Sequence, residues 1–150
     1  MISGPTAGRP VEILLVEDNP GDVRLTIEGL KESKVHNYLH VAREGVEAMD
    51  FLRRSGKHAG AIRPDLILLD LNLPRMNGRE VLSAIKSDVN LKSIPVVILT
   101  TSRAEQDVLR SYELQANCYI TKPADLERFI TMVKSIEDFW FSIVTLPHHM

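Results

Sequence analysis

Acidic side chains follow two short apolar segments of the sequence, and a hydroxyl and an ammonium group follow two others. Glu17 and Asp18 come directly after the first apolar segment, and Asp70 comes after the third. Thr100 follows the fourth segment, and Lys122 comes shortly after the fifth. If these segments are strands that end at one edge of a sheet, their polar groups can converge on a single site.

Three carboxylates at close range repel one another, and a divalent cation relieves that repulsion. Oxygen-only ligands suit Mg²⁺, which binds one or two carboxylates, keeps several waters and accepts phosphate oxygens. Phosphoryl transfer needs mainly positioning and charge neutralisation, and a carboxylate such as Asp70 is a competent nucleophile for it. Lys122 would then place a positive charge on one phosphoryl oxygen, and Thr100 would donate a hydroxyl proton to another. The chemistry predicted for these residues is formation of an aspartyl phosphate.

Alternating strands and helices are predicted to position these groups. Short apolar runs that stop at polar residues predict five strands, at 13–16, 38–42, 66–69, 96–99 and 117–120. Apolar residues at helical spacing predict helices around 23–30, 46–52, 81–85 and 108–112, and a long fifth helix from Asp125. This alternation predicts a doubly wound α/β fold with a five-stranded parallel sheet. The flavodoxin-like strand order 2-1-3-4-5 would make the first and third strands neighbours.

The length and charge of the chain narrow the classes of protein to which it could belong. Residues 1–10 predict a flexible N-terminal segment, 11–147 a single domain and 148–150 a short tail. A net charge of −2 argues against a nucleic-acid-binding surface. Since no stretch approaches the ~20 apolar residues that span a bilayer, we expect no membrane segment and a cytoplasmic location. The single cysteine excludes an intramolecular disulfide.

Some of these polar residues also have a purely structural interpretation. Asp18 could cap a helix that opens near Pro20, because an aspartate after a strand is a common helix cap. Taken alone, the pair Lys122-Pro123 gives almost no information about function. The functional interpretation depends on four polar groups occurring in the expected order at the ends of four predicted strands. These groups are Glu17-Asp18, Asp70, Thr100 and Lys122.

The motifs at these strand ends resemble those of receiver domains of two-component response regulators. They comprise Leu14 to Asn19, Leu68 to Pro74 with Gly78, Leu99-Thr100 and Thr121-Lys122-Pro123. The resemblance covers about residues 11–136 and implies the receiver fold.

This resemblance also implies a role for each site residue. Asp70 is the phosphorylated residue, and it binds magnesium together with Asp18, the backbone carbonyl of Asn72 and, through water, Glu17. Thr100 and Lys122 are the groups that stabilise the phosphoryl group. Thr100 and Tyr119 form the switch pair that changes conformation on phosphorylation.

A narrower resemblance indicates the partner. Four segments are similar to stand-alone regulators of the cyanobacterial-phytochrome type, namely 63–65, 111–114, 136–140 and 145–147. This similarity implies a light-sensing, phytochrome-type histidine kinase as the phosphoryl donor.

The last predicted helix carries more apolar surface than one sheet face can cover. One stripe of it has alternating steps of three and four residues, which are typical of a helix–helix seam. The seam comprises Phe129, Met132, Ile136, Phe139 and Ile143. We therefore expect an extended helix that packs on a second copy in a homodimer; alternatively, the residues after Phe139 fold back on their own domain.

The sequence thus predicts a phosphoacceptor switch rather than an enzyme. An Asp-nucleophile phosphatase is a weaker alternative, because its leaving group needs an acid two residues after the nucleophile, where this chain has Asn72. A second alternative is an interaction module with a vestigial phosphoacceptor pocket.

Overall fold

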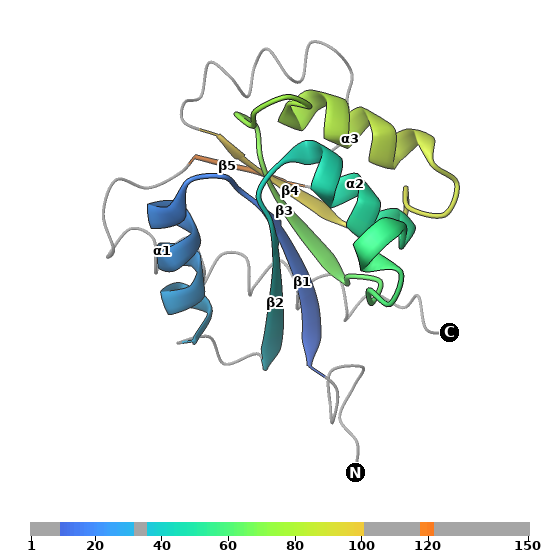
Figure 1. Ribbon diagram of the computed structural model, residues 1–150. Coiled ribbons are helices and arrows are strands. Elements are labelled where there is room, and N and C mark those ends of the chain that lie inside the picture. The colour runs from blue at the N-terminus through green and yellow to red at the C-terminus, as the bar shows by residue number, and fades with distance from the viewer. Residues whose placement is uncertain (1–9, 32–35, 101–117, 122–150) are drawn as a thin grey trace.

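A five-stranded parallel sheet lies at the centre of the fold, with strand order β2-β1-β3-β4-β5 (Figure 1). The structure, a computed structural model, describes residues 10–31, 36–100 and 118–121. The strands are β1 (Val11–Val16), β2 (Asn37–Ala42), β3 (Leu66–Asp70), β4 (Val96–Thr100) and β5 (Cys118–Thr121). The predicted strand order and α/β class are therefore confirmed, and the predicted strand limits are correct to within two residues.

Three α-helices are described, and they cover both faces of the sheet (Figure 1). α1 (Pro20–Lys31) lies on one face, and α2 (Gly45–Arg53) and α3 (Gly78–Ser87) lie on the other. The helix expected around 108–112 and the extended last helix from Asp125 lie outside the described residues. Within the described part of the chain, no helix combines the length and apolar character that crossing a membrane requires.

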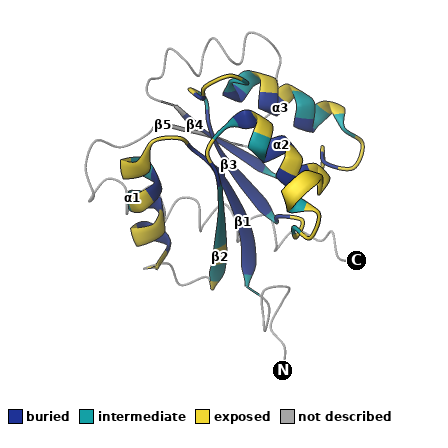
Figure 2. Ribbon diagram, viewed as in Figure 1, coloured by how far each residue is buried: buried dark blue, intermediate teal, exposed yellow. Residues whose placement is uncertain are grey.

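The inner strands are buried on both faces because helices cover the sheet from both sides (Figure 2). Alternate residues face opposite layers. In β1, Ile13 and Leu15 belong to the core under α1, whereas Leu14 and Val16 belong to the core under α2 and α3. All residues of β1 and β3 are buried. The continuous apolar runs in the sequence therefore have a direct structural cause.

Two apolar side chains expected in the helix–sheet contacts are exposed instead. Ile27 of α1 is 37% exposed and Val46 of α2 is 47% exposed. Thr26 takes the buried position in α1, because its hydroxyl donates to the carbonyl of Asp22 at 2.8 Å and is thereby satisfied. In α2, Ala48 occupies the core-facing position instead of Val46. The prediction is wrong for these two residues, whereas the other apolar residues predicted for these helices are buried, namely Val23, Leu30, Met49, Phe51 and Leu52.

The edge strand β2 is only partly covered (Figure 2). Tyr38 is 54% exposed, and His40 lies 2.7 Å from the carboxylate of Glu12 on the neighbouring strand β1. A polar pair of this kind is tolerated here because one side of the strand is open to solvent.

The connection from α2 to β3 spans residues 54–65 and contains a short 3₁₀ turn, η1 (Gly56–His58). Arg54, with φ of 57°, ends α2 in the left-handed region. Farther along, the Arg63 guanidinium donates to the carbonyl oxygen of Asn90 and the hydroxyl of Ser93. Gly60 is exposed, and no described atom would lie within 4 Å of a Cβ placed on it. This connection is thus fixed near its ends and open at Gly60.

Candidate metal centre

Three carboxylates meet where β1 and β3 end. One oxygen from each of Glu17, Asp18 and Asp70 lies within 4.8 Å of the other two. The pairing of Val16 with Leu69 in the two parallel strands brings the following carboxylates to the same edge of the sheet. Glu17 is 1% exposed and Asp70 is 2% exposed, while Asp18 is open to solvent. We call these three residues the acidic cluster.

Backbone amides hold both buried carboxylates. The N–H of Asn19 donates to Oε2 of Glu17 at 3.2 Å, and the N–H of Asn72 donates to Oδ1 of Asp70 at 3.1 Å. In each case the donor is the backbone amide two residues after the acid. For Asp70 this is the turn that aspartate side chains commonly form with their own backbone. These hydrogen bonds orient the two carboxylates.

Asn19, rather than Asp18, caps α1. Its Oδ1 accepts the N–H of Asp22 at 3.1 Å, and the helix begins at Pro20, a residue well suited to the first helical position. The cap interpretation of Asp18 is therefore wrong, and Asp18 lies in the acidic cluster instead.

The start of α3 packs directly against the backbone of Asp70. A Cβ on Gly78 would lie 2.5 Å from the carbonyl oxygen of Asp70 and 2.6 Å from Cα of Leu71. The Gly78 N–H donates to the Leu71 carbonyl at 3.0 Å and closes the loop 71–77 at its base. A complete capping box between Asn77 and Glu80 fixes the first turn of α3. Asp70 is thus held by the strand behind it and the helix beside it.

The acidic cluster offers only oxygen ligands, and two of its members are removed from bulk water. Two buried carboxylates so close together need positive charge between them. Oxygen ligands of this kind are those of a hard divalent cation such as Mg²⁺ or Mn²⁺. The residues present therefore fit a divalent cation.

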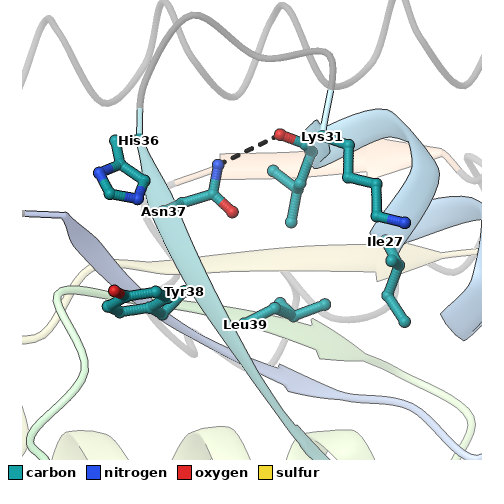
Figure 3. Close-up of a pocket in the computed structure, with 7 residues that line it drawn as sticks. Ile27, Lys31, His36, Asn37, Tyr38 and Leu39 are labelled. Carbon is teal, nitrogen blue, oxygen red and sulfur yellow. Dashed lines mark hydrogen bonds between the residues drawn. The ribbon is translucent and has the colours of Figure 1, made fainter.

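A separate hollow of about 310 Å³ lies between the end of α1 and the start of β2 (Figure 3). Ile27 and Lys31 line it from the helix, and His36 to Leu39 line it from the strand. The Asn37 side-chain amide donates to the Leu30 carbonyl at 3.2 Å across one side of it. None of its described lining residues carries a carboxylate, so this hollow differs in chemistry from the acidic cluster.

Other predicted site residues are placed only in part. Thr100 ends β4 and pairs with Thr121 of β5, so Lys122 follows the neighbouring strand directly. Tyr119 lies in β5, opposite Ile98 of β4. The side chains of Thr100 and Tyr119 lie outside what the structure describes, as do Lys122 and the whole predicted dimer seam from Phe129 to Ile143.

Sequence reasoning missed one group of residues near the site. Glu44 and Gly45, at the start of α2, contact Arg75 and Met76 of the loop 71–77. The glycine at the predicted start of a helix was the one available signal, because it permits a close backbone approach.

Comparison with known families identifies the family of the chain. Residues 13–134 match the family described as the response regulator receiver domain. The chain belongs to this family. The receiver is 53% identical over 138 residues to response regulator Rcp1 of Synechocystis sp., a match that covers 92% of this chain and 94% of that protein. The predicted family resemblance is confirmed.

Solved structures agree with this assignment. The receiver matches the phosphorylated cyanobacterial phytochrome response regulator RcpA with a TM-score of 0.83 and 55% identity, over 92% of this chain and 99% of that one. It matches the Mn²⁺-bound form of Rcp1 with a TM-score of 0.81 and 53% identity, over the same shares of the two chains. The receiver is a response regulator homologous to Rcp1.

Proposed function

We propose that Asp70 accepts a phosphoryl group from a histidine kinase, with Mg²⁺ held at the acidic cluster. The observation that carries the proposal is the convergence of three carboxylates within 4.8 Å, with Asp70 buried at the end of β3. The phosphorylated state of RcpA and the Mn²⁺-bound state of Rcp1 are properties of those relatives, and both support the same chemistry here.

The ligand oxygens of the cluster suit an octahedral cation. Oxygens on opposite sides of Mg²⁺ lie about 4.2 Å apart, because each bond is about 2.1 Å long. A set spread over as much as 4.8 Å accommodates this ion best if one carboxylate binds through water. Asp18 and Asp70 would bind directly, Glu17 through water, and the backbone carbonyl of Asn72 would complete the protein ligands. When bound, the cation neutralises charge on the phosphoryl oxygens.

The side chain of Asp70 acts as the nucleophile. One of its carboxylate oxygens forms a bond to phosphorus as the P–N bond of the donor phosphohistidine breaks, and the electron pair of that bond returns to the imidazole. The Asn72 N–H, 3.1 Å from Oδ1 of Asp70, holds the carboxylate during the transfer. Thr100 and Lys122 then bind the phosphoryl oxygens, and Thr100 and Tyr119 switch conformation together.

Likeness to relatives supports a partner for this reaction. The identity of 55% to a cyanobacterial phytochrome response regulator favours a phytochrome-type histidine kinase as the donor.

A homodimer is supported by the apolar seam formed by Phe129, Met132, Ile136, Phe139 and Ile143. Sedimentation tests the homodimer: a strict monomer at high concentration, with and without phosphorylation, would contradict it.

Intact-mass measurement after incubation with acetyl phosphate and Mg²⁺ tests the proposed function. We expect a gain of one phosphoryl group in the wild type and none in Asp70→Asn. A matched control is Asp50→Asn, which changes an exposed aspartate on α2 and retains the mass gain. Chelation of the metal with EDTA prevents the gain in the wild type and in Asp50→Asn.

Two outcomes oppose the proposal and point to its alternatives. Absence of any mass gain in the folded wild-type protein would indicate a vestigial pocket. Sustained turnover of a generic phosphate ester would indicate a phosphatase.

A further inference from the structure

The first residues of α2 are joined to the loop that follows Asp70. Glu44 occupies the N-cap position of α2, yet its side chain makes no cap hydrogen bond. A residue at this position commonly uses its side chain to accept an amide of the first turn. Here Oε1 of Glu44 lies 3.1 Å from Nη1 of Arg75, which is 31 residues away in the sequence. The carboxylate thus connects two separate segments instead of capping its own helix.

A backbone contact lies beside this ion pair. A Cβ on Gly45 would lie 2.3 Å from the carbonyl oxygen of Met76 and 2.8 Å from its Cβ. Helix α2 therefore touches the main chain of the loop, and glycine is needed for that approach. Arg75 has a φ of 61°, in the left-handed region that side chains with a Cβ rarely adopt. Such a conformation persists where neighbouring contacts hold it in place.

The same loop carries groups of the acidic cluster. Asn72 donates its N–H to Asp70, and the loop closes on Gly78 next to the Asp70 backbone. Leu73, 8% exposed, anchors the middle of the loop in the core under α2 and α3. Gly78 thus holds one end of the loop 71–77, and the contacts with α2 hold the part near Arg75. Where Asn72 lies relative to Asp70 depends on both attachments.

We propose that Glu44, Gly45 and Arg75 form a clasp that positions the loop 71–77 for cation binding at the acidic cluster. The inference rests on the proposed function, since it concerns the same cation. All three are positioning residues: they act on Asn72 through the loop and supply no ligand themselves. The clasp makes α2 part of the support of the site, although α2 carries none of its acids.

The competing interpretation is an ordinary surface ion pair. The Arg75 side chain is 74% exposed, and exposed pairs contribute little to global stability. The chain offers a matched control in Arg53 and Asp88, 4.0 Å apart, whose arginine side chain is 53% exposed. This second pair joins the end of α2 to the residues after α3, away from the loop 71–77. Comparing the two pairs separates an effect on the site from a general effect of losing surface charge.

Calorimetric titration with Mg²⁺ alone tests the clasp. We expect Arg75→Ala and Glu44→Ala each to weaken Mg²⁺ binding about threefold to tenfold, below the range usual for direct supports of a metal ligand. Arg53→Ala leaves the affinity within about twofold of the wild type. The exchanged pair, Glu44→Arg with Arg75→Glu, restores most of the affinity that each alanine variant loses. Arg75→Lys keeps the positive charge and binds Mg²⁺ more tightly than Arg75→Ala does. Gly45→Ala weakens binding more than either charge variant, because it displaces the loop backbone.

Unchanged Mg²⁺ affinity in the charge variants would overturn the clasp. If Arg75→Ala and Glu44→Ala bind Mg²⁺ as tightly as Arg53→Ala does, the pair is a surface contact only. Failure of the exchanged pair to restore affinity overturns the clasp as well. A urea unfolding curve for each variant shows that it is folded, and if Gly45→Ala does not fold, the two charge variants decide alone. Absence of Mg²⁺ binding in the wild type is a separate outcome that refutes the proposed function itself.

Discussion

β2 and β3 flank the same strand, β1, and pair with it in the same parallel sense, yet their surroundings differ. β3 is buried along its whole length, pairs with β4 on its other side and ends in Asp70. β2 lies at the edge of the sheet, is mostly half-exposed and runs within two residues into α2.

The difference shows what a chemical site requires of its strand. Asp70 is placed by neighbours on both sides of β3, by two core layers and by the start of α3. β2 has a single strand neighbour, and it accommodates the exposed Tyr38 and the imidazole of His40. The acids of this receiver therefore follow β1 and β3, which are buried strands with a neighbour on each side.

The strongest test of this comparison is a substitution at Gly78, which contacts the backbone at the end of β3. We expect Gly78→Ala to lower the free energy of unfolding by about 3 kcal/mol or more, because its Cβ would meet the backbone of Asp70 and Leu71. Gly60→Ala is the control, since no described atom lies near its Cβ, and we expect a change of less than about 1 kcal/mol. Urea denaturation measures both. Equal stabilities for the two variants would show that the close approach to Asp70 is not needed.

Truncation of one leucine in each strand compares the two strands directly. Leu68 of β3 is 1% exposed, so Leu68→Ala should cost about 2–5 kcal/mol of unfolding free energy through lost burial and a cavity. Leu39 of β2 is only partly buried, and Leu39→Ala should cost about 1 kcal/mol. The two values come from the same denaturation experiment. A loss at Leu39 as large as that at Leu68 would contradict the difference between the edge and the centre.

The smallest expected effect concerns Lys86, at the end of α3 and near the start of β4, the other neighbour of β3. Its ammonium donates to the carbonyl oxygens of Lys92 and Ile94 at 3.1 and 3.3 Å. Burial lowers the pKa of Lys86 below its ordinary value of 10.5. Between the lowered pKa and 10.5 the unfolded chain binds more protons than the folded one, so this group makes stability rise with pH.

Comparison with Lys86→Met measures that contribution. As pH is raised from about 8 to about 10, we expect the free energy of unfolding of the wild type to rise relative to that of the variant. A difference between the two proteins that stays constant over this window would argue against a lowered pKa.

Much of the fold could be predicted because its signals are local. The runs 13–16, 66–69 and 96–99, which lie within β1, β3 and β4, are apolar throughout, since both faces of each strand are covered. Glu17, Asp18 and Asp70 stand directly after two of these runs, so one assumption about strand order was enough to bring them together. That order came from known folds rather than from this sequence.

The contacts that sequence reasoning missed depend on how distant segments pack. No spacing rule connects Glu44 to Arg75, because a loop and a helix start meet only once the sheet has formed. The exposure of Ile27 has a similar cause: Thr26 can occupy the buried side because Asp22 accepts its hydroxyl hydrogen bond. Apolar periodicity uses only the hydrophobicity of each residue. It therefore cannot detect a hydrogen bond that compensates for burying a hydroxyl group.

The open connection at Gly60 makes the receiver suitable for engineering. It leads into the beginning of β3, at the opposite end of that strand from Asp70. Lengthening a surface loop carries only a small entropic cost, and exposed loop tips are the places that tolerate insertions best. A short peptide tag or a fluorescent label inserted beside Gly60 would therefore provide a handle for following the protein without disturbing its acidic cluster.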